Sequence, residues 1–260
     1  MHTDWQYRTR LLLGNTQLCK LQHTHVLIIG LGGVGSWASE HLVRSGIGNI
    51  SLVDSDTITE SNINRQAIAL HSTVNRKKTD VMAERLKDIN PDLIVNTYDI
   101  FVDDKTISAL PSFTTFDVVL DCIDTLSPKI THIKTCLDTQ TPLISSLGSA
   151  GKSDPSCVRI SDISKSYNCT LGRMLRKRLH KIGIYEGFSV VFSPEEIDKS
   201  KVIQEHGKNK RSNAGSISII PALFGTLMAA EVINRCKSAK QEISTSKISG
   251  ISYSGTKFES

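Results

Sequence analysis

The sequence predicts an α/β fold of the doubly wound, Rossmann-like type, with a mainly parallel sheet and a C-terminal extension of strands and helices. Short, nearly unbroken apolar runs alternate with stretches of helical periodicity, which is typical of a parallel sheet covered on both faces. A glycine-rich turn follows the first apolar run and leads into a helical stretch. The chain has 260 residues, 39% of them hydrophobic, which is enough for a substantial core.

The first 151 residues account for most of this sheet. Helical periodicity is clear where Val81, Met82, Leu86 and Ile89 recur near one face. In a doubly wound sheet the ligand binds at the carboxyl ends of the strands. The predicted strands are 25–30, 50–54, 93–97, 116–121 and 143–146, and the predicted helices are 34–45, 75–89, 103–110 and 128–138.

The sequence pattern changes after Gly151. Two further strands, 157–160 and 188–192, are predicted on either side of a basic helix. The segment 193–213 is polar and rich in Lys, which predicts a mobile crossover loop. The chain is therefore predicted to contain an N-terminal helical arm (1–24), a core domain (25–151), a C-terminal lobe (152–236) and a flexible tail (237–260).

One uncharged segment, 213–230, could be mistaken for a membrane span. It contains Asn213, Pro221 and Gly225, and it is shorter than the about 20 predominantly apolar residues that a span requires. Proline is well suited to the first turn of a helix. We therefore expect a buried helix that begins near Pro221.

Charge and cysteine content favour an ordinary cytoplasmic protein. The formal net charge is +5, so an anionic partner is permitted but not required. The six cysteines are widely spaced and form no C-x-x-C pair, which predicts no zinc site and no dense disulfide framework. The polar N-terminus has no secretory signal pattern.

The motif Gly30-Leu-Gly-Gly-Val-Gly35 is the first element that points to a ligand. Gly30, Gly32, Gly33 and Gly35 permit a tight turn in which backbone N–H groups and the positive end of the following helix approach phosphates. The motif alone also fits dinucleotide-binding sheets in general, or a tight turn without a ligand.

Polar residues downstream separate the two candidate nucleotides. Asp54 lies 24 residues beyond Gly30 and is placed to accept hydrogen bonds from a ribose, which both NAD and ATP possess. Side-chain amides and two cations follow Asp54 in the sequence. They favour ATP over NAD because the planar guanidinium of Arg and the ammonium group of Lys both bind phosphate oxygens. These residues are Asn62, Arg65, Gln66 and Lys78. Arg65 or Lys78 taken alone would fit a solvated surface equally well.

Asp124 follows the fourth predicted strand at the same edge of the sheet. Its carboxylate is suited to hold Mg²⁺ against a triphosphate, or to cap the helix expected to begin near Pro128. Its position beside the predicted phosphates favours the metal.

Five elements occur in the order of a known superfamily: the glycine motif, Asp54-x-Asp56, Asn62-x-Asn-Arg65-Gln66, Lys78 and Asp121-x-x-Asp124. On these residues the sequence resembles the ubiquitin-activating-enzyme-like superfamily, which includes the bacterial adenylyltransferases of molybdopterin and thiamine synthesis. The resemblance implies that 25–151 is an ATP-binding adenylation core. In it Asp54 would bind ribose, Asn62, Arg65 and Lys78 would bind phosphates, and Asp124 would bind Mg²⁺.

The same resemblance implies a homodimer. Arg8 matches the N-terminal arginine finger of the family, which reaches ATP across the dimer, and Arg10 is close enough to be the alternative.

The whole chain looks like the tRNA threonylcarbamoyladenosine dehydratase branch, through Asn-Pro91, Gly-Ser-Ala-Gly-Lys-x-Asp-Pro155 and Phe-Gly225. Relatives that pass on sulfur or a ubiquitin-like protein usually carry a cysteine in the crossover loop, and this chain has none between Cys169 and Cys236. The resemblance implies ATP-dependent dehydration, by cyclisation, of a modified adenosine in tRNA after adenylation of its carboxylate.

Three alternative functions remain open. The first is an adenylyltransferase for a ubiquitin-like sulfur carrier, with which a sulfur-transfer protein would dock. The others are a nicotinamide oxidoreductase and a non-catalytic scaffold, although Arg65, Lys78 and Asp124 together argue against the scaffold.

A tRNA substrate requires a basic surface, and the predicted helix after residue 170 supplies one. The alternative is a solvated amphipathic helix with its apolar side turned inward, and the two interpretations are compatible. The residues expected to contact tRNA are Arg173, Arg176, Lys177, Arg178 and Lys181.

Overall fold

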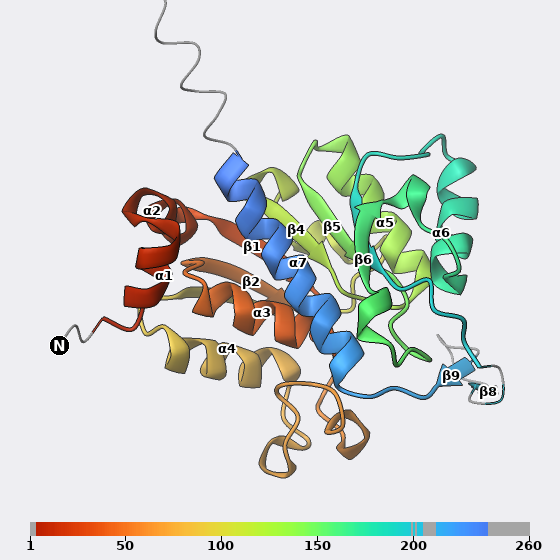
Figure 1. Ribbon diagram of the computed structural model, residues 1–260, viewed down its shortest axis with the longest axis horizontal. Coiled ribbons are helices and arrows are strands. Elements are labelled where there is room, and N and C mark those ends of the chain that lie inside the picture. Colours follow the sequence, from red (N-terminus) through yellow and green to blue (C-terminus); the bar gives the residue numbers. More distant parts are fainter. Residues whose placement is uncertain (1–3, 199, 201, 205–211, 239–260) are drawn as a thin grey trace, which may run out of the picture.

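The computed structural model describes residues 4–198, 200, 202–204 and 212–238. Its main feature is a seven-stranded sheet with the order β3-β2-β1-β4-β5-β7-β6, in which only β6 runs antiparallel to its neighbour (Figure 1). This confirms the predicted doubly wound α/β class. The strands are β1 (His25–Ile29), β2 (Asn49–Val53), β3 (Ile94–Tyr98), β4 (Val118–Asp121), β5 (Leu143–Ser146), β6 (Arg159–Asp162) and β7 (Ser189–Phe192).

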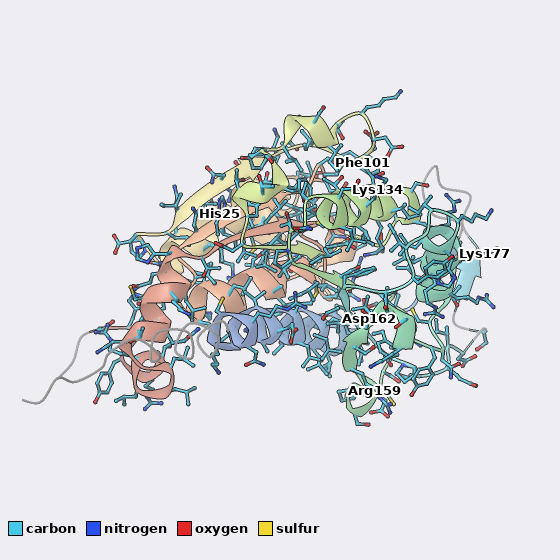
Figure 2. The ribbon with its side chains drawn as sticks, turned by 90° about the horizontal axis from the view of Figure 1, so that it is seen from above. His25, Phe101, Lys134, Arg159, Asp162 and Lys177 are labelled. Carbon is cyan, nitrogen blue, oxygen red and sulfur yellow. The ribbon has the colours of Figure 1, made fainter. Side chains whose placement is uncertain are left out.

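Helices cover both faces of this sheet, with α7 on one side and α5, which carries Lys134, on the other (Figure 2). The alternation of side chains along β1 shows why both faces need cover. Val26 and Ile28 join a core with α3, α4 and α7, whereas Leu27 and Ile29 join a second core with α5 and α6. The helices are α1 (Tyr7–Leu13), α2 (Asn15–His23), α3 (Gly35–Arg44), α4 (Lys78–Ile89), α5 (Leu126–Asp138), α6 (Thr170–His180) and α7 (Ile219–Ser238).

Most predicted elements match the structure to within two residues at each end, and three of the differences concern the start or the type of an element. The helix predicted from residue 75 begins at Lys78, because Asn75 adopts a positive φ of 68° that a helix cannot contain. The helix predicted over 103–110 is only a 3₁₀ turn, Ile107–Ala109. The strand predicted over 157–160 lies two residues later, because Pro155–Cys157 forms a 3₁₀ turn first.

The region 152–236, predicted as a separate lobe, contributes β6 and β7 to the same sheet. Within the segment predicted as a loop, 193–213, the described residues include a short antiparallel pair, β8 (Val202–Gln204) and β9 (Ser212–Ala214). The predicted tail lies outside the described residues from 239 onward.

Helix α7 is a core helix, as expected from the sequence near Pro221. It has the length and composition of a membrane span, but one side of it is buried against α3 and the sheet. A Cβ atom at Gly225 would lie 2.5 Å from the carbonyl oxygen of Val34 and 2.8 Å from the amide nitrogen of Ala38. The missing side chain therefore lets the two helices approach to backbone contact. The buried residues of α7 are Ile220, Pro221, Phe224, Gly225, Met228, Ala229 and Val232.

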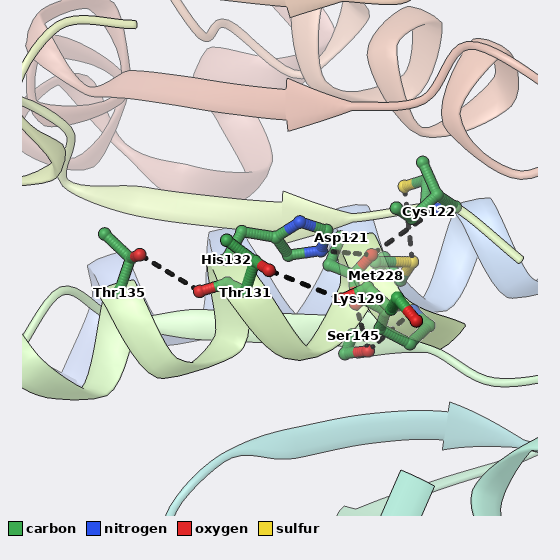
Figure 3. Close-up of polar contacts among 10 residues, drawn as sticks. Asp121, Cys122, Lys129, Thr131, His132, Thr135, Ser145 and Met228 are labelled. Carbon is green, nitrogen blue, oxygen red and sulfur yellow. Dashed lines mark hydrogen bonds and ion pairs between the residues drawn. The ribbon is translucent and has the colours of Figure 1, made fainter. Parts of the chain in front are cut away.

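A buried ionic network joins β4, β5 and α5 (Figure 3). The ammonium group of Lys129 lies 2.5 Å from Oδ2 of Asp121, and both side chains are completely buried. The hydroxyl of Ser145 donates to the same oxygen at 2.6 Å and accepts from Lys129 at 3.0 Å. Nε2 of His132 lies 2.9 Å from Oδ1 of Asp121, without the alignment of a hydrogen bond. The network sits directly beneath the residues that follow β4 and β5.

Burial alone would raise the pKa of Asp121, but the charges of Lys129 and His132 outweigh it and lower the pKa from 3.8 to about 2. A carboxylate whose pKa is lower in the folded than in the unfolded chain stabilises the fold most above about pH 4. This stabilisation is lost as the pH falls toward about 2.

Removing Lys129, the first of the two positive partners of Asp121, should destabilise the fold. Lys129→Met would leave the Asp121 carboxylate buried without its main partner, and we expect a loss of about 3–5 kcal/mol in the free energy of unfolding. The double variant Asp121→Asn with Lys129→Met removes both charges and should regain most of that loss. Urea unfolding followed by circular dichroism measures both effects.

The control is Lys134→Met on the same helix, where Lys134 forms an exposed ion pair with Asp138. It should change the free energy of unfolding by less than about 1 kcal/mol. Equal stabilities of Lys129→Met and Lys134→Met would contradict the structural role of the buried pair.

Candidate functional site

A cavity of about 1080 Å³ opens at the carboxyl ends of β1, β2, β4 and β5. This is the edge at which doubly wound sheets bind their ligands. Ten of the predicted site residues line it: Gly30, Gly32, Gly33, Asp54, Asp56, Asn62, Arg65, Gln66, Lys78 and Asp124.

The glycine turn between β1 and α3 has no room for a side chain at Gly30 or at Gly35. Gly30 adopts a φ of +94°, and a Cβ atom there would lie 2.7 Å from the side chain of Ile123. A Cβ at Gly35 would lie 1.8 Å from the carbonyl oxygen of Gly30. Gly35 does not line the cavity, so its role is to let α3 start directly against the turn, with its positive end toward the cavity.

Asp54 lies at the end of β2 with its carboxylate almost fully buried. It accepts hydrogen bonds from the backbone N–H of Leu31 at 2.6 Å and of Asp56 at 2.9 Å. Burial raises the pKa of Asp54, while the charge of Lys78 at 3.7 Å opposes that rise. The backbone thus fixes this carboxylate at the cavity edge, where a ribose hydroxyl can donate to it.

Lys78 begins α4, and its side chain is buried except for 6% of its surface. Its ammonium group lies 2.7 Å from Oδ2 of Asp56, whose own side chain is 67% exposed. A buried cation with an exposed counter-ion can exchange that partner for a phosphate oxygen, because the carboxylate is free to turn toward water.

The segment between β2 and α4 holds its own polar side chains in place. Arg65 donates through Nη1 to the carbonyl of Ser61 at 2.8 Å and to Oδ1 of Asn64 at 2.9 Å. Oδ1 of Asn62 accepts from the backbone N–H of Thr59 at 3.2 Å. Gln66 lies in the cavity wall, and its Oε1 is buried without a hydrogen-bond partner among the described residues.

Asp124 lies in the cavity wall between β4 and α5. The N-cap residue of α5 is Thr125, which directly follows Asp124. The described residues contain no group of three or more His, Cys, Asp or Glu side chains able to hold a metal by themselves. A single carboxylate beside a phosphate site suits Mg²⁺, which is usually bound by one or two carboxylates together with substrate phosphates.

Among the parts of the cavity wall that were not predicted as site residues, two lie close together. Ser146 ends β5 and is followed by Leu147–Ala150, and Ala214–Ser216 precede α7. They meet where the backbone N–H of Gly151 donates to the carbonyl of Gly215 at 2.8 Å. Gly148–Gly151 belong to a motif on which the chain resembles the dehydratase branch, whereas Ala214–Ser216 gave no signal because they border the segment predicted as a loop.

A carboxylate supports this wall from outside. Glu195 accepts hydrogen bonds from the backbone N–H of Ser153 at 2.9 Å and of Asp154 at 3.0 Å. The ammonium group of the buried Lys152 donates to the backbone carbonyl of Glu195. The chain after β7 is thereby tied to the loop after β5.

Neither the predicted Arg8 nor the predicted basic residues of α6 line the cavity. Arg8 is exposed on α1 and is not among the lining residues, while Arg10 pairs with Asp4. On α6, Arg176 is half-buried and donates to the hydroxyl of Ser166, so it does not point freely into solvent. Lys177 projects from the outer side of the helix (Figure 2). The other predicted basic residues, Arg173, Arg178 and Lys181, are also exposed.

Comparisons with known proteins agree with this geometry. The model of the ThiF family matches residues 5–259. The chain is 37% identical over 234 residues to the tRNA threonylcarbamoyladenosine dehydratase of Bacillus subtilis (strain 168), covering 87% of this chain and 92% of that protein. It is 32% identical over 260 residues to the Escherichia coli (strain K12) protein of the same name, covering 91% and 97%.

A solved structure extends this similarity to the fold. The E. coli tRNA N6-threonylcarbamoyladenosine dehydratase in complex with ATP superposes with a TM-score of 0.80 at 31% identity, covering 90% of this chain and 95% of that chain. Sequence and structure thus agree along nearly the whole length, and the chain belongs to the ThiF family.

Proposed function

We propose that this protein is an ATP-dependent tRNA threonylcarbamoyladenosine dehydratase. The observation that carries the proposal is the convergence of Asp54, Arg65, Lys78 and Asp124 on one cavity. The relatives that share this name match the chain over most of its length, and one of them was solved with ATP.

The proposed reaction activates a carboxylate and then closes a ring. A carboxylate oxygen of the threonylcarbamoyl group attacks the α-phosphorus of ATP, and the bond to the β-phosphate bridging oxygen breaks to release pyrophosphate. A nucleophile of the same group then attacks the acyl carbon. The acyl carbon–oxygen bond breaks, AMP leaves with the carboxylate oxygen, and the nucleophile loses a proton. The modified nucleoside thus loses the elements of one water.

The protein contributes position and charge. Asp54 would fix the ribose, and the N-terminal end of α3 would face the phosphates. Lys78 and Arg65 would stabilise the negative charge that grows on the α-phosphate during attack. Mg²⁺, held by Asp124 and the phosphates, would neutralise further charge. Lys78 is already desolvated, so its charge acts more strongly than that of an exposed lysine would.

The proposal also includes where the protein acts, how it assembles and which further partner it binds. We propose a cytoplasmic homodimer in which Arg8, or alternatively Arg10, reaches the phosphates of the partner. A sulfur-transfer protein as a further partner also remains a proposal. The exposed position of Arg8 on α1, outside the cavity of its own chain, is compatible with this role.

The function is tested by incubating the protein with MgATP and threonylcarbamoylated tRNA. Mass spectrometry of the nucleosides should show the loss of one water from the modified adenosine. An unchanged mass under conditions that support ATP binding would instead favour adenylation of a ubiquitin-like sulfur carrier. Mixing such a carrier with the protein and ATP would then yield a carrier adenylate.

Removing either charge at the phosphates should abolish turnover of ATP and preserve the fold. For Lys78→Ala and Asp124→Ala we expect a fall in kcat of at least about a hundredfold, because each side chain stabilises developing charge. Release of AMP and pyrophosphate in the presence of tRNA measures this effect.

The matched control is Lys77→Ala, since Lys77 precedes Lys78 but pairs with Asp99 and does not line the cavity. It should retain turnover close to that of the unaltered protein. Full activity of Lys78→Ala or Asp124→Ala would show that the substituted residue is not part of the catalytic site.

Charge reversal on the outer side of α6 should weaken tRNA binding. Lys177→Glu places a negative charge where we expect phosphate contact, so affinity should fall and the slope of log affinity against log salt should decrease by about one. Filter binding across a salt series measures both quantities.

Lys87→Glu, an equivalent change on the exposed side of α4, serves as the control and should have little effect. The same affinity and salt slope for both variants would count against α6 as a tRNA surface.

A further inference from the structure

The chain makes a rigid turn where α6 ends. Gly183 adopts a φ of +79°, and its N–H donates to the carbonyl of His180 at 3.2 Å. The N–H of Ile184 donates to the carbonyl of Leu179 at 3.0 Å. These two bonds form a Schellman motif, and the side chain of Ile184 packs on the core that contains Leu179. The residue after Ile184 is therefore held in a fixed position.

That residue is Tyr185, whose side chain is 60% exposed. Its ring lies 4.9 Å from the ring of His180, with an angle of 36° between the planes. One face of His180 thus supports the tyrosine, while most of the tyrosine ring remains in contact with water. A large aromatic ring held exposed on a rigid turn is suited to stack with a planar ligand.

Cations surround this ring pair. On a helix, residues three and four apart are neighbours, so Lys177 lies beside His180, and Arg173 lies one turn before Lys177. Lys181 follows His180 directly. Arg173, Lys177 and Lys181 are all exposed, and they share one side of α6 at intervals of four residues. Two carboxylates lie close to this turn: Glu186 follows Tyr185, and Asp162 accepts a hydrogen bond from the backbone N–H of Gly187. The three Lys and Arg side chains outnumber these two acids.

We propose that Tyr185, supported by His180, is a stacking platform for an unpaired base of the tRNA, while Arg173, Lys177 and Lys181 contact the adjoining phosphates. This inference rests on the proposed function. Exposed aromatic rings next to cations are the means by which proteins bind single-stranded RNA without reading its sequence. Double-stranded RNA offers phosphates but no free base face.

The platform serves a nucleotide other than the reacting one. Helix α6 starts beside the cavity wall, where a Cβ atom at Gly172 would lie 2.8 Å from the side chain of Leu147. His180 is eight residues further along the helix, a rise of about 12 Å. A base stacked on Tyr185 is thus held at a distance from the cavity while the modified adenosine enters it.

The experiment compares two RNA probes in fluorescence anisotropy: a labelled hairpin with an unpaired loop, and a labelled duplex with the sequence of its stem. Tyr185→Leu keeps an apolar side chain but removes the ring, and it should weaken hairpin binding by about five- to a hundredfold. It should leave duplex binding and the salt slope unchanged. Tyr185→Phe should bind the hairpin like the unaltered protein.

Lys177→Glu provides the contrasting variant, because it should weaken binding of both probes and reduce the salt slope. Equal loss of hairpin and duplex binding in Tyr185→Leu, or no loss in either, would overturn the platform. The platform would also be overturned if Tyr185→Leu changed the oligomeric state in sedimentation but left the affinity for the hairpin unchanged. That result would assign the ring to a protein interface.

The experiments distinguish a wrong assignment of the Tyr185 platform from a wrong proposed function. Loss of one water from tRNA by the unaltered protein tests the function, whereas the hairpin comparison requires no turnover. Dehydration together with hairpin affinity that is insensitive to Tyr185→Leu would reject the platform and retain the enzyme.

Discussion

The carboxylate of Asp121 is the constraint on which the carboxyl edge of the sheet depends. It is fully buried at the end of β4, and Lys129 and Ser145 both contact it. A buried charge is tolerated only with its partners in place, so β4, β5 and α5 are held in one arrangement. Residues at the ends of these strands line the cavity: Asp124 follows β4, and Ser146 is the last residue of β5. The network thus fixes the cavity wall without taking part in its chemistry.

The charges of the cavity itself are arranged differently. Lys129 is sealed from water, whereas Lys78 pairs with the exposed carboxylate of Asp56 at the cavity. The first ion pair has no access to a ligand and serves the fold. The second can open when phosphate arrives, because water can solvate the displaced carboxylate. Two lysines with similar partners therefore differ in role through the exposure of their counter-ions, which is a property of the tertiary structure.

This difference shows the limit of what the sequence predicted. The strands followed from their apolar runs, and the cavity residues followed from motifs at the carboxyl edge, since a doubly wound sheet brings such residues together. Nothing in the sequence indicated that Lys129 and His132 are buried, because Lys and His in a helix are usually exposed. Residues 103–110 were wrongly predicted as a helix. The segment contains one 3₁₀ turn, Ile107–Ala109, and a turn of three residues is too short to be told from an α-helix by its sequence pattern. Ala214–Ser216 reach the cavity through tertiary contacts, in which the N–H of Gly151 donates to the carbonyl of Gly215 and Nδ2 of Asn64 donates to the carbonyl of Ser216.

Helix α6 shows how two interpretations of one sequence pattern can both hold. Leu175 and Leu179 are buried in the core, which satisfies the prediction of an amphipathic helix. The cations do not behave as one group, however, because Arg176 is turned toward Ser166 while Lys177 projects outward. The first turn of the helix packs against the cavity wall, and the last turn leads into the exposed ring of Tyr185. A single rigid element therefore spans the distance between the reacting group and the surface that we propose holds the rest of the RNA.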